Sequence, residues 1–159
     1  MNRRIFLTIV MSAACLGGSF PVGPQTARAQ VGAPPSRIYW AQSPQRAMAL
    51  ARHSRLPILA FVTSEGCGYC RKMESTVWSH PQIISQVEAG FVPLKLVASQ
   101  HRQLIASLGI RAYPTTILFT PEGKVIHRAQ GYMPPLQVAR LLRAARPAHL
   151  AGKSLPPVE

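Results

Sequence analysis

The sequence contains no aspartate, and its five glutamates stand against eighteen lysines and arginines, giving a formal net charge of +13. Such a charge suits a nucleic-acid-binding protein when the basic residues gather on one surface. Here no run of adjacent basic residues exceeds two, and the sequence has neither a basic stripe nor an RNA-reading aromatic motif. We therefore expect no nucleic-acid partner, and we interpret the charge as an arginine-rich, solvated surface.

Cysteine is also scarce, with only Cys15, Cys67 and Cys70 in 159 residues. A small domain stapled by disulfides usually has more cysteines, spaced further apart. A zinc site needs four protein ligands, or three and a water. Apart from Cys15 near the N-terminus, no cysteine accompanies the Cys67–Cys70 pair, and the five histidines show no paired ligand spacing. These counts argue against a disulfide framework and against a metal site.

Long apolar runs are absent as well. The longest N-terminal apolar segment, residues 5–20, is shorter than the roughly 20 residues that a membrane-spanning helix needs. Arg3-Arg4 precedes this segment, and Ala27-Arg28-Ala29 follows it as an A-x-A cleavage pattern. This arrangement predicts a signal peptide over residues 1–29, removed on export.

The export route stays open between the general secretory and the twin-arginine pathway. Residues 3–7 resemble a twin-arginine signal, although two arginines also occur in ordinary signal peptides. Cys15 weakly resembles a lipoprotein processing site, but Ser12 stands where a large aliphatic residue is usual. Each route leads out of a bacterial cytoplasm. We expect a periplasmic protein that begins at Gln30 and has weak or no membrane contact after cleavage.

The rest of the chain has room for a single domain and shows no internal repeat. We expect a linker over 30–41, in which Ile38-Tyr39-Trp40 docks on the domain, a domain over 42–146 and a proline-containing flexible tail over 147–159. The predicted elements are a helix opened by Ser43-Pro44, a strand at 58–62, helices at 67–78 and 81–88, a strand at 91–97, a helix at 100–108, strands at 115–120 and 124–129, and a last helix from Pro134-Pro135. This order predicts an α/β layered fold in which a parallel strand pair is extended by a hairpin.

The motif Cys67-Gly68-Tyr69-Cys70 follows a buried strand and opens a helix. The first turn of a helix has free N–H groups and the positive end of the helix dipole, so it stabilises a thiolate and lowers the pKa of Cys67. Arg71 and Lys72 add positive charge there, whereas Glu65 opposes it. A disulfide between Cys67 and Cys70 would close a loop with too few residues to stabilise the fold appreciably.

The pair is therefore expected to act chemically. Cys67 leads the helix and should be accessible, so its thiolate attacks a substrate disulfide. Cys70, one turn later and more buried, then resolves the mixed disulfide. A structural disulfide and half of a metal site are the alternatives that the spacing alone leaves open.

Several segments together resemble the thioredoxin superfamily over about residues 40–146. The segments are Phe61-Val62, Cys67 to Met73, Leu108 to Thr115, Pro121 to Lys124, and Gly131. The sequence is most similar to exported single-domain thioredoxin-like proteins and to the C-terminal domain of bacterial thiol-disulfide interchange transporters. This resemblance implies a thioredoxin-like three-layer α/β sandwich with a central mixed sheet.

The resemblance also implies a function and a docking site. Pro114 would be cis and face the cysteine pair, and the backbone of Tyr113 would pair with the substrate chain like a strand. The protein would be a periplasmic thiol-disulfide oxidoreductase, working as a reductase because it lacks the long helical insertion of strongly oxidising members. Its partners would be protein thiols and disulfides and a membrane electron-donor protein. Its redox group would be the Cys67–Cys70 disulfide, without a further cofactor.

Two positions depart from the family pattern. Thioredoxins have a buried acid where Phe61 stands and a tryptophan where Gly66 stands. We therefore assign proton handling to water or Glu65, and do not expect the cytosolic thioredoxin reductase as partner. The alternative function is a metal- or haem-maturation binding module using the same cysteines, for which Met73 is the only soft ligand close in sequence.

Overall fold

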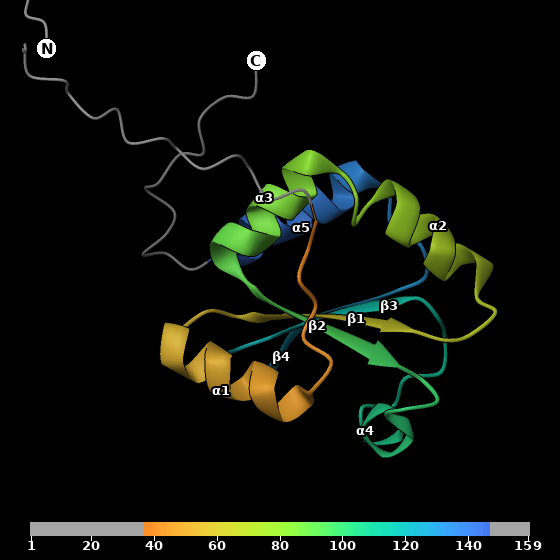
Figure 1. The fold of residues 1–159 in the computed structure, drawn as a ribbon, viewed down its shortest axis with the longest axis horizontal. Helices are drawn as coiled ribbons and strands as arrows, with labels where there is room; N and C mark the ends of the chain where they lie inside the picture. The colour runs from red at the N-terminus through yellow and green to blue at the C-terminus, as the bar shows by residue number, and fades with distance from the viewer. Residues whose placement is uncertain (1–36, 147–159) are drawn as a thin grey trace, which may run out of the picture. The chain divides into compact units, whose positions relative to one another are not determined.

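The computed structural model describes residues 37–146. The predicted signal peptide (1–29), the first part of the linker and the predicted tail (147–159) lie outside the described residues. In chain order the elements are α1 (Pro44–Ser54), β1 (Ile58–Thr63), α2 (Gly68–Thr76), α3 (Pro81–Gly90), β2 (Val92–Val97), α4 (Arg102–Ser107), β3 (Thr115–Phe119), β4 (Val125–Gln130) and α5 (Pro135–Ala145) (Figure 1).

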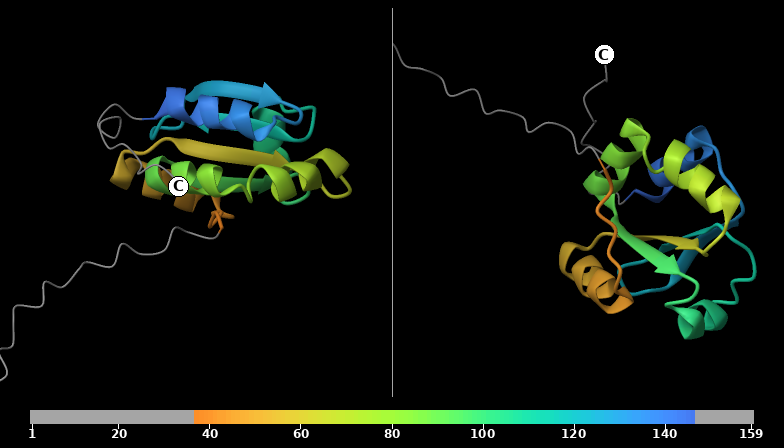
Figure 2. Two further views of the ribbon diagram at one scale, coloured as in Figure 1. Left: turned by 90° about the horizontal axis from the view of Figure 1, so that it is seen from above. Right: turned by 45° about the vertical axis from the view of Figure 1, so that its right-hand side comes forward.

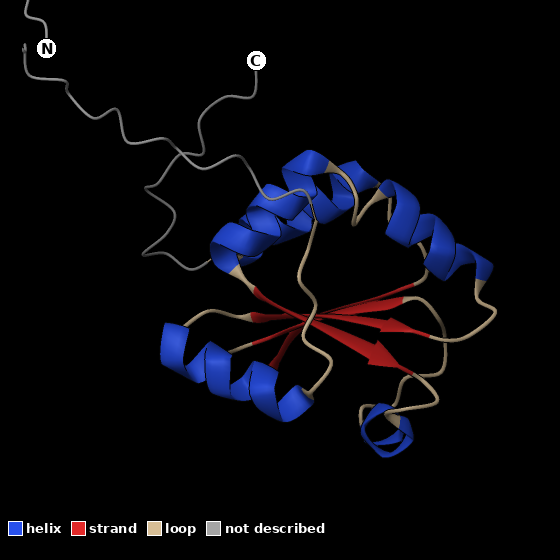
Figure 3. Ribbon diagram, in the orientation of Figure 1, coloured by secondary structure: helices blue, strands red, loops and turns tan. Residues whose placement is uncertain are grey.

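The four strands form one mixed sheet in the order β2-β1-β3-β4. β1 is parallel to β2 and antiparallel to β3, and β3 and β4 form an antiparallel hairpin. Figure 3 shows α1 and α4 on one side of the sheet and α2, α3 and α5 on the other. In the view from above in Figure 2, α3 and α5 lie next to one another over the same face. The expected three-layer α/β sandwich with a mixed sheet is confirmed.

Strand β1 lies at the centre of the sheet, and all six of its residues are buried. Successive side chains of a strand point to opposite faces. Leu59 and Phe61 therefore enter the core under α2, α3 and α5, whereas Ile58, Ala60 and Val62 enter the core under α1 and α4. Burial on both faces explains why this segment is apolar without alternation.

The segment before α1 is anchored to the domain. Trp40 packs against Trp78 and Phe61, with ring centroids 5.4 and 5.9 Å apart. Ala41 forms an isolated parallel bridge with Leu94. This part of the predicted linker docks as expected, adding aromatic surface to the core that lies under α2.

The predicted helix at 67–78 is longer than the observed α2. Cys67 is the N-cap of α2, and the helix ends at Thr76. Beyond it, the N–H of Trp78 bonds to the carbonyl of Met73, five residues back, in place of the helical four-residue spacing. This wider turn directs the chain towards α3.

Candidate active site

The cysteine pair lies where the chain passes from β1 into α2, at the right-hand edge of Figure 1. The connection is short. Gly66 turns it with φ of +75°, a conformation that costs glycine little because it has no Cβ. The turn places Cys67 directly at the start of α2, as the strand-to-helix pattern predicts.

Cys67 and Cys70 form a disulfide, with Cα atoms 5.2 Å apart. The Cys67 sulfur also accepts a hydrogen bond from the backbone N–H of Cys70 at 3.1 Å. The two cysteines differ in access, since Cys67 is half-buried and Cys70 is only 2% exposed. This confirms the predicted asymmetry, and it leaves Cys67 as the sulfur that another protein can reach.

The basic residues after the motif lie on the outer surface of α2, where Arg71 and Lys72 are exposed. The Lys72 ammonium lies over the ring of Tyr132, 4.7 Å from its centroid. The Tyr132 hydroxyl is 3.2 Å from the Thr76 hydroxyl. The chain segment before α5 is therefore held against the active-site helix by a cation–π contact and a hydrogen bond.

Glu65 is held on the other side of the motif. Its carboxylate accepts a hydrogen bond from the hydroxyl of Ser99, which follows β2. This bond, and then a bond from its own backbone, lowers the pKa of Glu65 below its usual range, with a smaller contribution from Arg102. An ionised carboxylate near Cys67 fits the expected opposing charge.

The structure brings the second predicted segment to the same place. The Tyr113–Pro114 peptide bond is cis, and the Pro114 carbonyl accepts a hydrogen bond from the N–H of Gly131 at 2.7 Å. Within residues 37–146, neither the N–H nor the carbonyl of Tyr113 forms a hydrogen bond. Both backbone groups of Tyr113 are therefore without a partner in the described part of the chain.

A pocket of about 300 Å³ joins the two segments. It is lined by Tyr69, Tyr113, Pro114, Gly131 and Tyr132. Tyr69 lies between the two cysteines in the sequence and is 65% exposed, so one wall of the pocket comes from the cysteine motif. The motif and the proline segment thus share one surface.

At the position where thioredoxins have a buried acid, the structure has the fully buried side chain of Phe61. Its register partner on β2 is Lys95, and the Lys95 ammonium forms an ion pair with Glu74 of α2 at 2.6 Å. Sequence reasoning missed this pair. A signal for it exists, because Lys95 interrupts an apolar strand and Glu74 follows Cys70 by one helical turn.

This ion pair links the active-site helix to the sheet, and its side chains are 28% and 39% exposed. Solvent screens such a pair, so we expect a coupling free energy of only about 0.2–1 kcal/mol between Glu74 and Lys95. Urea denaturation of Glu74→Gln, Lys95→Met and the double variant measures it as a double-mutant cycle. A coupling near zero would show that the pair does not hold α2 on the sheet.

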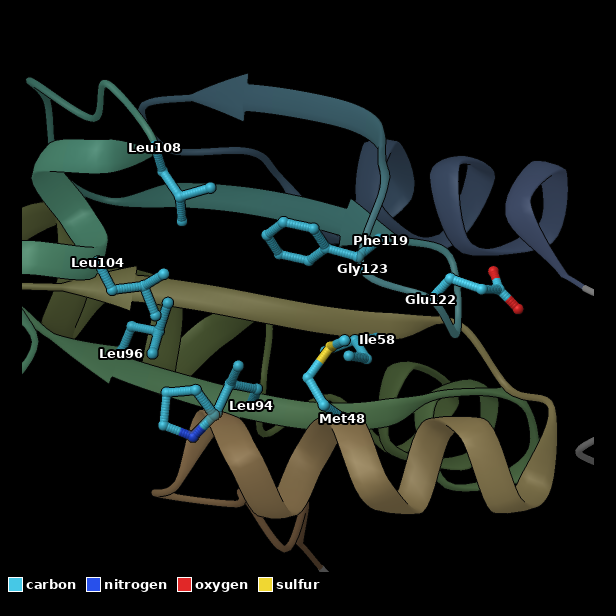
Figure 4. A pocket seen from close by; sticks show the side chains of 10 residues that line it. Met48, Ile58, Leu94, Leu96, Leu104, Leu108, Phe119, Glu122 and Gly123 are labelled. Atoms are coloured by element: carbon cyan, nitrogen blue, oxygen red, sulfur yellow. The ribbon is translucent and has the colours of Figure 1, made fainter.

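A different pocket lies on the opposite face of the sheet, under α1 and α4. Its volume is about 240 Å³, and its lining is mainly apolar (Figure 4). The titratable side chain on its wall is Glu122, whose carboxylate points away from the apolar side chains in Figure 4. This pocket therefore offers no group for thiol chemistry.

The described part of the chain has neither a cluster of metal-ligating side chains nor a helix that could span a membrane. Over residues 37–146, no three His, Cys, Asp or Glu side chains lie together in a way that could hold a metal ion. Over the same residues, no helix has the length and apolar character required to cross a membrane.

Comparisons with known proteins agree with this geometry. Residues 44–146 match the family described as thioredoxin-like domain. A thioredoxin from Thermus thermophilus is 25% identical, with a TM-score of 0.61 over 68% of this chain and 86% of that chain. No curated protein matches the sequence.

Two less similar solved structures show the same fold. A putative disulphide-isomerase from Bacteroides thetaiotaomicron is 19% identical, with a TM-score of 0.61 over 69% of this chain and 93% of that chain. The oxidised C-terminal domain of Neisseria meningitidis DsbD is 16% identical, with a TM-score of 0.57 over 68% of this chain and 100% of that chain. With its disulfide at the start of α2 and a family match over most of the described residues, the chain belongs to the thioredoxin-like family and is a thiol-disulfide oxidoreductase.

Proposed function

We propose that the protein is an exported reductase of protein disulfides that works in the periplasm. A membrane electron-donor protein then reduces its Cys67–Cys70 disulfide again. The observation that carries the proposal is the unequal access of the two cysteines, with Cys67 reachable and Cys70 buried behind it. The sequence pattern of residues 1–29 supports export. The reductive direction is supported by the element order over residues 37–146, which has no long helical insertion of the kind found in the strongly oxidising members.

The reaction proceeds in two exchange steps. The Cys67 thiolate attacks one sulfur of a client disulfide, forming a mixed disulfide and releasing the other client sulfur as a thiolate that takes up a proton. Cys70 loses its proton and attacks the Cys67 sulfur, and the second client sulfur leaves as a thiolate that takes up a proton, which balances the one that Cys70 released. The client gains two electrons and two protons, and the Cys67–Cys70 disulfide is formed. A dithiol of the electron donor reverses this oxidation.

The residues around the pair supply binding and charge. The N–H of Cys70 donates to the Cys67 sulfur, and the amino-terminal end of α2 favours negative charge on it. The positive charges of Arg71 and Lys72 also favour the thiolate form of Cys67, whereas the negative charge of Glu65 disfavours it. The free backbone groups of Tyr113 pair with the client chain, which holds its sulfur in front of Cys67.

Expression of the full chain in a Gram-negative bacterium tests the proposal. We expect a periplasmic product that starts at Gln30 and catalyses reduction of insulin disulfides by dithiothreitol. Its reduction potential should lie nearer to the value of about −270 mV for thioredoxin than to the value of about −120 mV for a strong periplasmic oxidant. A cytoplasmic, uncleaved product would contradict export, and a potential near −120 mV would contradict the reductive direction. An inactive protein that binds copper or haem would favour the maturation-module alternative.

A further inference from the structure

The pocket that joins the cysteine motif to the proline segment is unusually rich in tyrosine. The chain has four tyrosines, and three of them, Tyr69, Tyr113 and Tyr132, line this one pocket. They come from the cysteine motif, the proline segment and the segment before α5. Aromatic walls favour contact with another aromatic or large apolar side chain, and a volume of about 300 Å³ is sufficient for one such side chain.

Basic residues occur on the segments that carry this pocket. The Lys72 ammonium lies over the Tyr132 ring, which forms part of the wall. Arg71 precedes Lys72 on α2, Arg111 lies two residues before Tyr113, and both are exposed. Three positive charges therefore lie on the segments that carry the pocket.

None of the residues that line the pocket is acidic. The charge of Glu74 is matched by Lys95. Glu65 keeps its charge, and its carboxylate is held by the hydroxyl of Ser99, which does not line the pocket. The pocket itself therefore combines aromatic walls with the Lys72 ammonium that lies over one of them.

We propose that this pocket selects client segments in which the reactive cysteine is flanked by acidic residues and by one bulky apolar or aromatic side chain. Lys72 on the pocket wall, together with the exposed Arg71 and Arg111, steers acidic segments towards Cys67 and raises their rate of association. The tyrosine walls then take up the apolar side chain. This inference rests on the proposed function, because it names the client class of the same site.

Single-turnover kinetics with the full-length Cys70→Ser variant test the proposal. The probes are short peptides with one cysteine carried as a mixed disulfide with thionitrobenzoate. The Cys67 thiolate attacks the peptide sulfur, forms a Cys67–peptide disulfide and releases thionitrobenzoate, whose absorbance gives the rate. One peptide has Glu and Phe beside its cysteine, a second has Lys and Phe, and a third has Glu and Ser. Each rate is divided by that of 2-mercaptoethanol with the same peptide, which cancels intrinsic reactivity.

We expect the Glu-Phe peptide to react about tenfold faster than the Lys-Phe peptide at low ionic strength. The ratio should shrink in 0.5 M salt, because exposed charges are screened there. Lys72→Gln should reduce the ratio about threefold, as expected for one exposed ion pair. The matched control is Lys124→Gln, which removes the same charge from the exposed β3–β4 turn and should leave the ratio unchanged. Tyr69→Ala should lower the ratio of the Glu-Phe rate to the Glu-Ser rate about fivefold.

Equal reaction of all peptides, or equal effects of Lys72→Gln and Lys124→Gln, would overturn the client class. In that case a normal rate with the small neutral disulfide of 2-mercaptoethanol would leave the oxidoreductase function intact. Failure with this disulfide as well would instead contradict the proposed function itself.

Discussion

Replacing Cys70 by serine should convert the protein into a covalent trap for its clients, whereas Cys67→Ser should trap almost none. Cys67 is the reachable sulfur, and Cys70 is 2% exposed and placed behind it. Without Cys70, the mixed disulfide on Cys67 has no neighbouring thiol to resolve it. Without Cys67, the attacking sulfur is missing, and reductase activity should fall by at least about a thousandfold, as removal of a nucleophile does elsewhere.

The measurement is made on the full chain expressed in its native host. Adducts are separated on non-reducing gels and identified by mass spectrometry, which also names the client. Cys15, which lies in the predicted signal peptide, is replaced by serine in every variant so that it cannot form adducts of its own. Equal trapping by both variants would mean that either sulfur can attack. The division into an attacking and a resolving cysteine would then be wrong.

The sequence predicts the core of this site because its determinants are local. The buried strand, the turn at Gly66 and the cysteine pair at the helix start are contiguous in the chain. Their order alone places Cys67 outside and Cys70 inside. The hairpin and the mixed sheet follow from the order of elements and the short turn before β4 for the same reason.

The missed contacts join segments that are far apart in sequence. Glu65 meets Ser99 over 34 residues, Glu74 meets Lys95 over 21, and Thr76 meets Tyr132 over 56. Each depends on how α2 crosses the sheet and on the path of the chain before α5. Local patterns mark single members of these pairs, as Lys95 is marked by interrupting an apolar strand, but they hold no information on which distant residue each one meets.

The replacement of a buried acid by Phe61 has a consequence for both packing and chemistry. Phe61 contacts Trp40 and Trp78, with ring centroids 5.9 and 5.5 Å away, in an aromatic cluster under α2. Lys95, its neighbour on β2, turns to Glu74 instead. The chain thus has an apolar core where the family pattern has a titratable group, while its charged pair lies nearer the surface.

Phe61→Ala should therefore lower the free energy of unfolding by about 3–5 kcal/mol, the usual cost of emptying a large aromatic site in a core. The side chain is fully buried, and both tryptophans would lose contacts that they cannot recover without moving the anchored segment before α1. Urea denaturation of the oxidised protein measures the change. The control is Leu136→Ala on α5, where the side chain is 60% exposed and the loss should stay below about 0.5 kcal/mol.

A second substitution at this position, Phe61→Leu, separates a packing role of Phe61 from a role in proton transfer. If Phe61 only packs, Phe61→Leu should recover much of the lost stability, because it refills most of the cavity. The rate of thiol exchange per folded molecule should stay close to that of the unaltered protein over pH 5–9, since Phe61 has no proton to give or take. A change in the shape of that pH profile in Phe61→Leu would contradict this assignment, because it would mean that the side chain controls the protonation of Cys70. A loss of stability below about 1 kcal/mol in Phe61→Ala would show instead that the aromatic cluster does not support the active-site helix.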